Sequence, residues 1–142
     1  MPLLPGEEPV DDDEIIYRRI PLSRFDAEKR LVAVHAFNPR DADTTGLSVT
    51  RAKYHPTIED VARNPRGSKY YVAVLKVTEL RARGIDVVPR PLHAEDPQHP
   101  EYDPGHAELP QITYDKRHTD DVIQLMELLA TQLCGDVRGP YP

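Results

Sequence analysis

Three of the six histidines lie close together in one proline-rich segment. His93, His99 and His106 fall within residues 89–110, which also contain five acidic side chains and six prolines. Imidazole and carboxylate groups together can bind Zn²⁺ or a similar ion. The spacing matches no metal motif, and structural zinc usually recruits cysteine, which is not nearby. We expect residues 89–110 to form a solvated loop, with a metal site at the three histidines as an alternative.

A second set of candidate residues lies in or beside stretches that are typical of strands. It combines arginines, hydroxyl groups, a histidine and a glutamate, which can bind phosphate, donate hydrogen bonds and stabilise a developing positive charge. The set comprises Tyr17, Arg18 and Arg19 in the first predicted strand, Ser48 and Thr50 on one face of the third, and His106 and Glu108 near the end of the proline-rich segment.

The order of Arg18, Ser48 and Glu108 along the chain resembles the arginine, serine and glutamate strand motifs of ADP-ribosyltransferases. The resemblance implies NAD as the cofactor. Arg18 or Arg19 would neutralise the pyrophosphate, Ser48 would support the nicotinamide end, and Glu108 would stabilise the ribosyl cation. The sequence departs from the family at Ser48-Val49-Thr50, where Ser-Thr-Ser is usual, and at His106, where a second Glu or Gln is usual.

A second resemblance spans residues 15–110. Residues 17–21 (YRRIP), 46–49 (GLSV) and 103–107 (DPGHA) are similar to short motifs in a set of small uncharacterised bacterial proteins. This resemblance implies a bacterial origin and no particular activity. It marks Arg18, Arg19, Ser48 and His106 as positions of interest.

Other catalytic signatures are absent from the sequence. There is no glycine-rich phosphate-binding loop and no Gly-x-Ser-x-Gly nucleophile elbow. The single cysteine, Cys134, falls near the end of the last predicted helix, where we expect a small buried hydrophobic residue rather than a nucleophile.

Charge is distributed unevenly along the chain. The net charge is −6, and residues 1–14 carry six acidic side chains and no basic ones; the remainder holds 18 acidic and 18 basic residues. A neutral body argues against nucleic-acid binding, which usually requires a net basic surface. The acidic leader, residues 1–13, is expected to be unstructured and could steer a basic protein partner.

One unpaired cysteine fits a reducing compartment. We find no signal peptide and no apolar run of the roughly 18 residues that a membrane span needs. The sequence therefore predicts a cytoplasmic protein without membrane contact.

Hydrophobic periodicity predicts strands at residues 14–20, 30–37, 46–54, 70–77 and 85–88, edge-strand potential at 105–109, and a last short strand at 111–114. Helical turns are expected at 23–29, 57–61 and 79–83. The one strong helix spans 119–134, with Thr119 as its N-cap and an apolar stripe through Val122, Met126, Leu129 and Leu133.

This order is not a regular alternation of strands and helices. It predicts an α+β fold, a mostly antiparallel sheet with short helices and one long C-terminal helix packed on it. We expect one globular domain at residues 14–135 and a flexible tail at 136–142. Three functions stay open: a binding or regulatory module that acts through protein contacts and could form a homodimer, an NAD-using transferase, and a metal site in the 89–110 loop.

Overall fold

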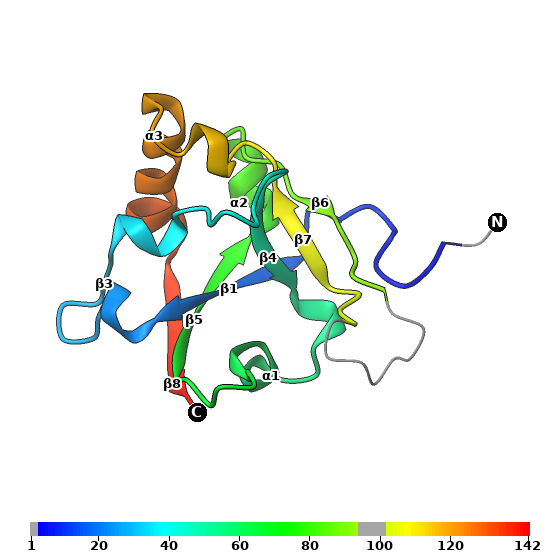
Figure 1. Cartoon of the computed structure of the whole chain (residues 1–142), viewed down its shortest axis with the longest axis horizontal. Coiled ribbons are helices and arrows are strands. Elements are labelled where there is room, and N and C mark those ends of the chain that lie inside the picture. The colour runs from blue at the N-terminus through cyan, green and yellow to red at the C-terminus, as the bar shows by residue number, and fades with distance from the viewer. Residues whose placement is uncertain (1–2, 94–101) are drawn as a thin grey trace.

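The computed structural model describes residues 3–93 and 102–142. Its centre is a six-stranded antiparallel sheet with the order β6-β7-β4-β1-β5-β8 (Figure 1). The predicted α+β class, an antiparallel sheet with one longer helix near the C-terminus, is confirmed. The strands are β1 (Ile15–Pro21), β4 (Leu47–Arg51), β5 (Tyr70–Lys76), β6 (Val88–Pro89), β7 (His106–Leu109) and β8 (Asp136–Tyr141).

The longest ladder joins β1 and β5, the two segments richest in β-branched and aromatic residues. It pairs seven residues on each strand, from Ile15 opposite Lys76 to Pro21 opposite Tyr70. By contrast, β1 pairs with β4 only at Ile16–Arg51 and Tyr17–Thr50. The two strands cross steeply in Figure 1, and a gap opens between them beyond Tyr17.

One face of the sheet carries the main core. It packs against α3 (Asp120–Leu128) and the single π-helical turn that continues it, Leu129–Leu133. The Thr119 hydroxyl accepts a hydrogen bond from the Val122 amide, as the N-cap prediction requires. The predicted stripe is buried in this core, because Val122, Met126, Leu129 and Leu133 each point toward the sheet.

The other face is covered only in part. The short helix α1 (Ile58–Ala62) buries Val61 and Ala62 against Val72 of β5, with tyrosines packed around them. Helix α2 (Val77–Ala82) follows β5 directly, but its Leu80 packs in the main core and not in the small cluster under α1. The polar residues of β4 and β7 lie beyond α1, on the part of this face that has no helix over it.

Several predicted elements are wrong in extent or type. The predicted strand at 30–37 is limited to β3 (Leu31–Val32), which pairs with β2 (Phe25–Asp26) and leads into a 3₁₀ turn, Val34–Phe37. The turn buries the consecutive residues Ala36 and Phe37 in one core, which a strand with alternating faces could not do. Residues 111–114 form a turn that leads into a 3₁₀ helix, Tyr114–Lys116, rather than a strand.

The ends of the chain also differ from expectation. Residues 136–141, expected as a flexible tail, form the edge strand β8 on β5, with Val137 buried. The leader, expected to be unstructured, makes defined contacts over residues 3–13. Its Val10 joins the main core, and Arg51 donates hydrogen bonds to the carbonyls of Gly6, Glu8 and Pro9.

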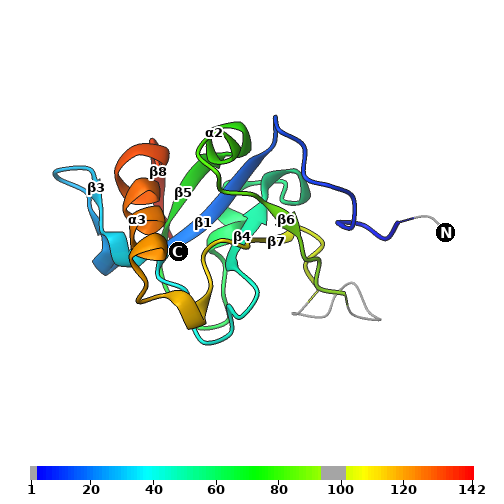
Figure 2. The ribbon, with the colours of Figure 1, turned by 90° about the horizontal axis from the view of Figure 1, so that it is seen from above.

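The leader and α3 lie at opposite ends of the molecule in two perpendicular views (Figures 1 and 2). The leader runs past β6, so it borders the same edge of the sheet as β7. Within the described residues, no helix has the length and apolar character needed to cross a membrane.

Candidate functional site

Strand pairing gathers most of the predicted site residues on one face of the sheet. Ser48 lies opposite Glu108, and Thr50 lies opposite both Tyr17 and His106. Residues that are directly opposite in neighbouring strands share a face, and residues two apart in one strand do too. Ser48, His106 and Glu108 therefore lie on one face of the sheet.

Arg18 lies on the opposite face, behind this group. Its Nη1 donates to the Ser48 carbonyl at 2.8 Å and its Nε to the Ala36 carbonyl at 3.3 Å. Burial lowers the pKa of Arg18 to about 10, although the nearby Asp43 opposes that shift, so the guanidinium is charged at neutral pH. Arg18 thus occupies the gap between β1 and β4 and satisfies main-chain carbonyls there.

Ser48 and His106 lie within hydrogen-bond reach of each other on the polar face. His106 Nε2 lies 3.2 Å from Ser48 Oγ, and His106 Nδ1 lies 2.8 Å from the Arg90 carbonyl oxygen. Ser48 Oγ also lies 2.8 Å from Oδ1 of Asp43, a side chain that is only 5% exposed. The result is a continuous chain of contacts from the Arg90 main chain to a buried carboxylate.

Glu108 is held beside this chain. Its Oε1 accepts a hydrogen bond from the Thr45 hydroxyl at 2.6 Å and lies 3.5 Å from Arg90 Nε. The residue is buried, whereas the Arg90 side chain is about half exposed. Arg90 therefore contributes both a main-chain acceptor for His106 and a guanidinium beside Glu108.

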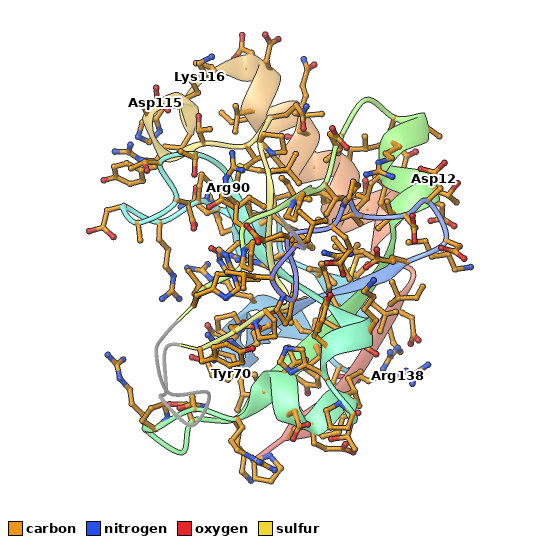
Figure 3. All side chains as sticks on the ribbon, turned by 90° about the vertical axis from the view of Figure 1, so that its right-hand side faces the viewer. Asp12, Tyr70, Arg90, Asp115, Lys116 and Arg138 are labelled. Carbon is orange, nitrogen blue, oxygen red and sulfur yellow. The ribbon has the colours of Figure 1, made fainter. Side chains whose placement is uncertain are left out.

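A pocket of about 580 Å³ opens at this edge of the sheet. Three separate segments line it: the leader, the β6 segment and β7. Its lining residues are Glu7, Pro89, Arg90, Pro91, Leu92, His93, His106 and Glu108. Figure 3 views the molecule from the side on which β6 lies, with Arg90 labelled. The pocket combines carboxylates, a guanidinium and two imidazoles with the apolar Leu92.

The rim of the pocket is formed by alternating prolines. The Arg90 amide donates to the His106 carbonyl, and the Leu92 amide donates to the Asp103 carbonyl. The intervening residues, Pro89 and Pro91, therefore fall on the outward side of the edge strand, where they have no N–H to donate. This edge offers acceptors to an approaching molecule but no main-chain donors at these two positions.

The other predicted binding residues have structural contacts. Tyr17 packs against the small cluster under α1, and the Arg19 guanidinium lies 5.1 Å from the centre of the Tyr70 ring. Arg19 is exposed on the same face as Ser48. Thr50 lies between Tyr17 and His106 in the ladder.

The predicted metal ligands are not gathered within the described residues. His93 and His106 both line the pocket, whereas His99 lies outside the described residues. Over residues 3–93 and 102–142, no group of three or more His, Cys, Asp or Glu side chains is placed to hold a metal ion. Cys134 lies apart from the pocket, in the turn after α3, where burial raises its thiol pKa to about 12.

Sequence reasoning missed Asp43, Thr45 and Arg90. Asp43 and Thr45 lie in the loop before β4, which was expected only as a turn-rich connection. Arg90 could have been found from its place in Pro89-Arg90-Pro91, because alternating prolines indicate an edge strand whose remaining amides face inward.

Comparisons of the chain with protein-family models, with curated proteins and with solved structures found no match. Function is therefore inferred from the contacts of the described residues.

Proposed function

We propose that the protein is a binding module and that its pocket beside β6 takes an extended segment of a protein partner. The observation that carries this proposal is the composition of the pocket. Its 580 Å³ volume is lined by side chains of both charge signs, and these come from the leader, the β6 segment and β7. A bacterial, cytoplasmic setting belongs to the same proposal, supported by the short motifs noted above and the single cysteine.

The chemistry of the rim favours a polypeptide over other ligands. The outward side at Pro89 and Pro91 carries no N–H group, which suits a ligand that brings its own N–H donors; the Pro89 carbonyl oxygen accepts a hydrogen bond from Arg90 Nη1 at 3.3 Å in the unbound chain. Leu92 is 44% exposed in the same pocket and gives an apolar contact. The carboxylates of Glu7 and Glu108 disfavour a phosphate backbone, whereas a polypeptide can offer amides, apolar groups and charges of either sign.

The test is an NMR titration of the full-length, ¹⁵N-labelled chain with a synthetic library of random ten-residue peptides. Binding should shift the amide signals of Arg90, Leu92, His106 and Glu108. The variant Arg90→Glu should lose these shifts, because it places a third carboxylate in the pocket.

The matched control for this titration is Arg138→Glu. Arg138 is an exposed arginine on β8, at the other edge of the sheet and well separated from Arg90 in Figure 3. It should bind the library like the unmodified chain. Shifts confined to other surfaces, or no shifts at millimolar total peptide, would contradict the proposal.

One observation favours a second function, an NAD-using transferase. Ser48 and Glu108 lie opposite each other in neighbouring strands, which the resemblance to ADP-ribosyltransferases requires, and Arg19 shares their face. Arg18 is bound to main-chain carbonyls, so Arg19 would have to neutralise the pyrophosphate. Calorimetric titration with NAD should then show binding that Arg19→Ala weakens. No heat of binding at millimolar NAD would remove this alternative.

A further inference from the structure

The Ser48 hydroxyl lies between two hydrogen-bond acceptors but has only one proton. His106 Nε2 lies 3.2 Å from the oxygen on one side, and Asp43 Oδ1 lies 2.8 Å from it on the other. A carbonyl oxygen only accepts hydrogen bonds, so the 2.8 Å contact with Arg90 requires His106 Nδ1 to carry a ring proton. In the neutral ring, Nε2 is then the free acceptor that faces Ser48.

Strand pairing fixes the positions of these groups. Ser48 lies on β4 and His106 on the adjacent β7, within a register that pairs four residues of each strand. The Arg90 amide donates to the His106 carbonyl, and the Arg90 carbonyl receives the ring N–H of the same residue. Arg90 thus binds His106 at two points, one on its main chain and one on its ring, and rotation of the ring would break the hydrogen bond from Nδ1.

A hydroxyl within reach of a base, where a third group orients the base, is the arrangement of an activated nucleophile. We propose that Ser48 is a nucleophile that accepts the acyl group of a carboxylic ester, with His106 as its base. His106 lines the pocket, so an ester bound there lies next to the pair. This activity goes beyond the proposed binding function and does not depend on it.

The reaction has two balanced steps. Ser48 Oγ forms a bond to the ester carbonyl carbon, its proton passes to His106 Nε2, and the bond to the alcohol oxygen breaks as that oxygen takes the proton from Nε2. Water then attacks the acyl carbon and gives its proton to His106 Nε2. The bond between that carbon and Ser48 Oγ breaks, Oγ takes the proton from Nε2, and the carboxylic acid is released. The Asp43 carboxylate, 2.8 Å from the same hydroxyl oxygen, holds Ser48 Oγ in place beside His106.

The test is covalent labelling of the full-length chain with an alkyl fluorophosphonate. An activated serine oxygen displaces fluoride from phosphorus and keeps the phosphonate, which mass spectrometry of peptides locates. The chain has three serines, Ser23, Ser48 and Ser68. Ser23 is exposed and Ser68, like Ser48, is half-buried, so both serve as internal controls for simple accessibility.

We expect the label on Ser48 and not on Ser23 or Ser68. His106→Gln should slow labelling by on the order of 100-fold, because a positioned base contributes at least that much. Arg138→Gln, on the far edge of the sheet, should label like the unmodified chain. Circular dichroism and thermal unfolding check that each variant is folded.

An unlabelled Ser48 in the unmodified chain would overturn the proposal without reference to any variant. Equal labelling of Ser68, or unchanged labelling in folded His106→Gln, would overturn it as well. The peptide titration described above is read from amide shifts and not from a covalent adduct, so failure of one proposal is distinguishable from failure of the other.

Discussion

Arg51 is the most deeply buried charged side chain among the described residues, and it organises the leader. Its Nε and Nη2 each lie 2.8 Å from a carboxylate oxygen of Glu14, and Nη1 donates to the carbonyls of Gly6 and Glu8. The guanidinium is fully buried, and the Glu14 side chain is 8% exposed. Paired and hydrogen-bonded in this way, the two charges can be buried without a large desolvation penalty.

Replacing Arg51 should therefore be costly. In Arg51→Met, Glu14 keeps its charge in a buried place without a partner, and we expect a loss of about 3 to 5 kcal/mol in the free energy of unfolding. Urea denaturation measures this loss. Arg138→Met, which removes an exposed arginine paired with Asp136, should change stability by less than about 0.5 kcal/mol. Equal effects of the two substitutions would show that Arg51 does not anchor the leader.

Glu8 should make the leader sensitive to acid. Burial raises the pKa of Glu8, but hydrogen bonds from Tyr54 and Lys53 and the charge of Arg51 outweigh burial and lower it from the usual 4.5 to about 2. A carboxyl with a lowered pKa in the folded chain stabilises the fold above its unfolded pKa. That stabilisation is lost as the pH falls through the folded value.

The measurement compares the unmodified chain with Glu8→Gln by urea denaturation at several pH values. The unmodified chain should be the more stable at pH 6, and the difference should shrink as the pH falls from 4.5 toward 2. Other acidic groups titrate in both proteins, so the difference isolates Glu8. A difference in stability that stays constant across this pH range would show that the charge of Glu8 does not stabilise the folded chain.

At the scale of elements, β6 is an edge strand whose outward amides have been removed by proline. Edge strands with free donors and acceptors are templates for pairing with other chains, and proline on the edge is one way to block this. The double variant Pro89→Val/Pro91→Val restores two outward N–H groups. We expect concentration-dependent self-association, measured by sedimentation velocity.

The control for this double variant is Pro65→Val, which alters an exposed proline in the turn after α1. It should sediment like the unmodified chain. If the double variant also stays monodisperse at high concentration, the prolines do not protect this edge.

The leader depends on a close approach at Gly6. Its φ of +88° favours glycine, and a Cβ at this position would lie 1.9 Å from the Pro104 carbonyl oxygen. Gly6→Ala should therefore displace the leader from residues 103–105. The leader contains no lysine or arginine, so a glutamate-specific protease is the suitable reagent. Cleavage after Glu7 should become faster; the Glu8–Pro9 bond is a poor substrate because proline follows the glutamate.

Gly135→Ala is the matched control for protease access, because no atom lies within 4 Å of the Cβ that it would add. Its cleavage rate in the leader should equal that of the unmodified chain. The same rate in Gly6→Ala would mean that the leader stays in place despite the clash.

At the scale of the whole molecule, the sheet joins residues from both ends of the described chain. Strand β5 lies between β1 and β8, so removal of residues 136–142 would expose one edge of a central ladder and delete the buried Val137. We expect this truncation to lower the free energy of unfolding by at least about 2 kcal/mol, the contribution of one buried valine side chain. Removal of Pro142 alone, which follows β8, should have no measurable effect.

The predictable part of the fold is the part where local pattern and tertiary packing agree. Residues 14–20 and 70–77 are rich in β-branched and aromatic side chains, and they form the longest ladder. The helix α3 was predictable as well, because Thr119 caps it and the apolar stripe from Val122 to Leu133 is buried in the core.

The unpredictable part depends on tertiary contacts that override local preference. Gly139 and Pro140 disfavour a strand, yet β8 forms because it is an edge strand on β5. The leader carries the composition of a disordered segment, and its order comes from Arg51, 37 residues beyond Glu14. The alternation of Leu47, Val49 and Arg51 placed that arginine on the apolar face of its strand. A charged residue on that face was the available signal that Arg51 needs a buried partner.

Part of the candidate site was also predictable from local pattern, and part was not. Strand alternation and chain order selected Ser48, His106 and Glu108 as candidates but were not enough to predict that they meet. They were not enough to place the Arg18 guanidinium, because its direction depends on the gap between β1 and β4. Asp43 comes from a connection whose path no local pattern specifies, whereas the prolines on either side of Arg90 were an available signal.

The alternating prolines of the pocket rim have a practical consequence for hydrogen–deuterium exchange. Pro89 and Pro91 have no amide hydrogen, and the amides of Arg90 and Leu92 already donate within the fold, so they exchange slowly before any ligand arrives. Exchange mass spectrometry would then record little change along this rim even at full occupancy. The methyl groups of Leu92, which is 44% exposed, are the better reporters, and selective ¹³C labelling of leucine would make them visible.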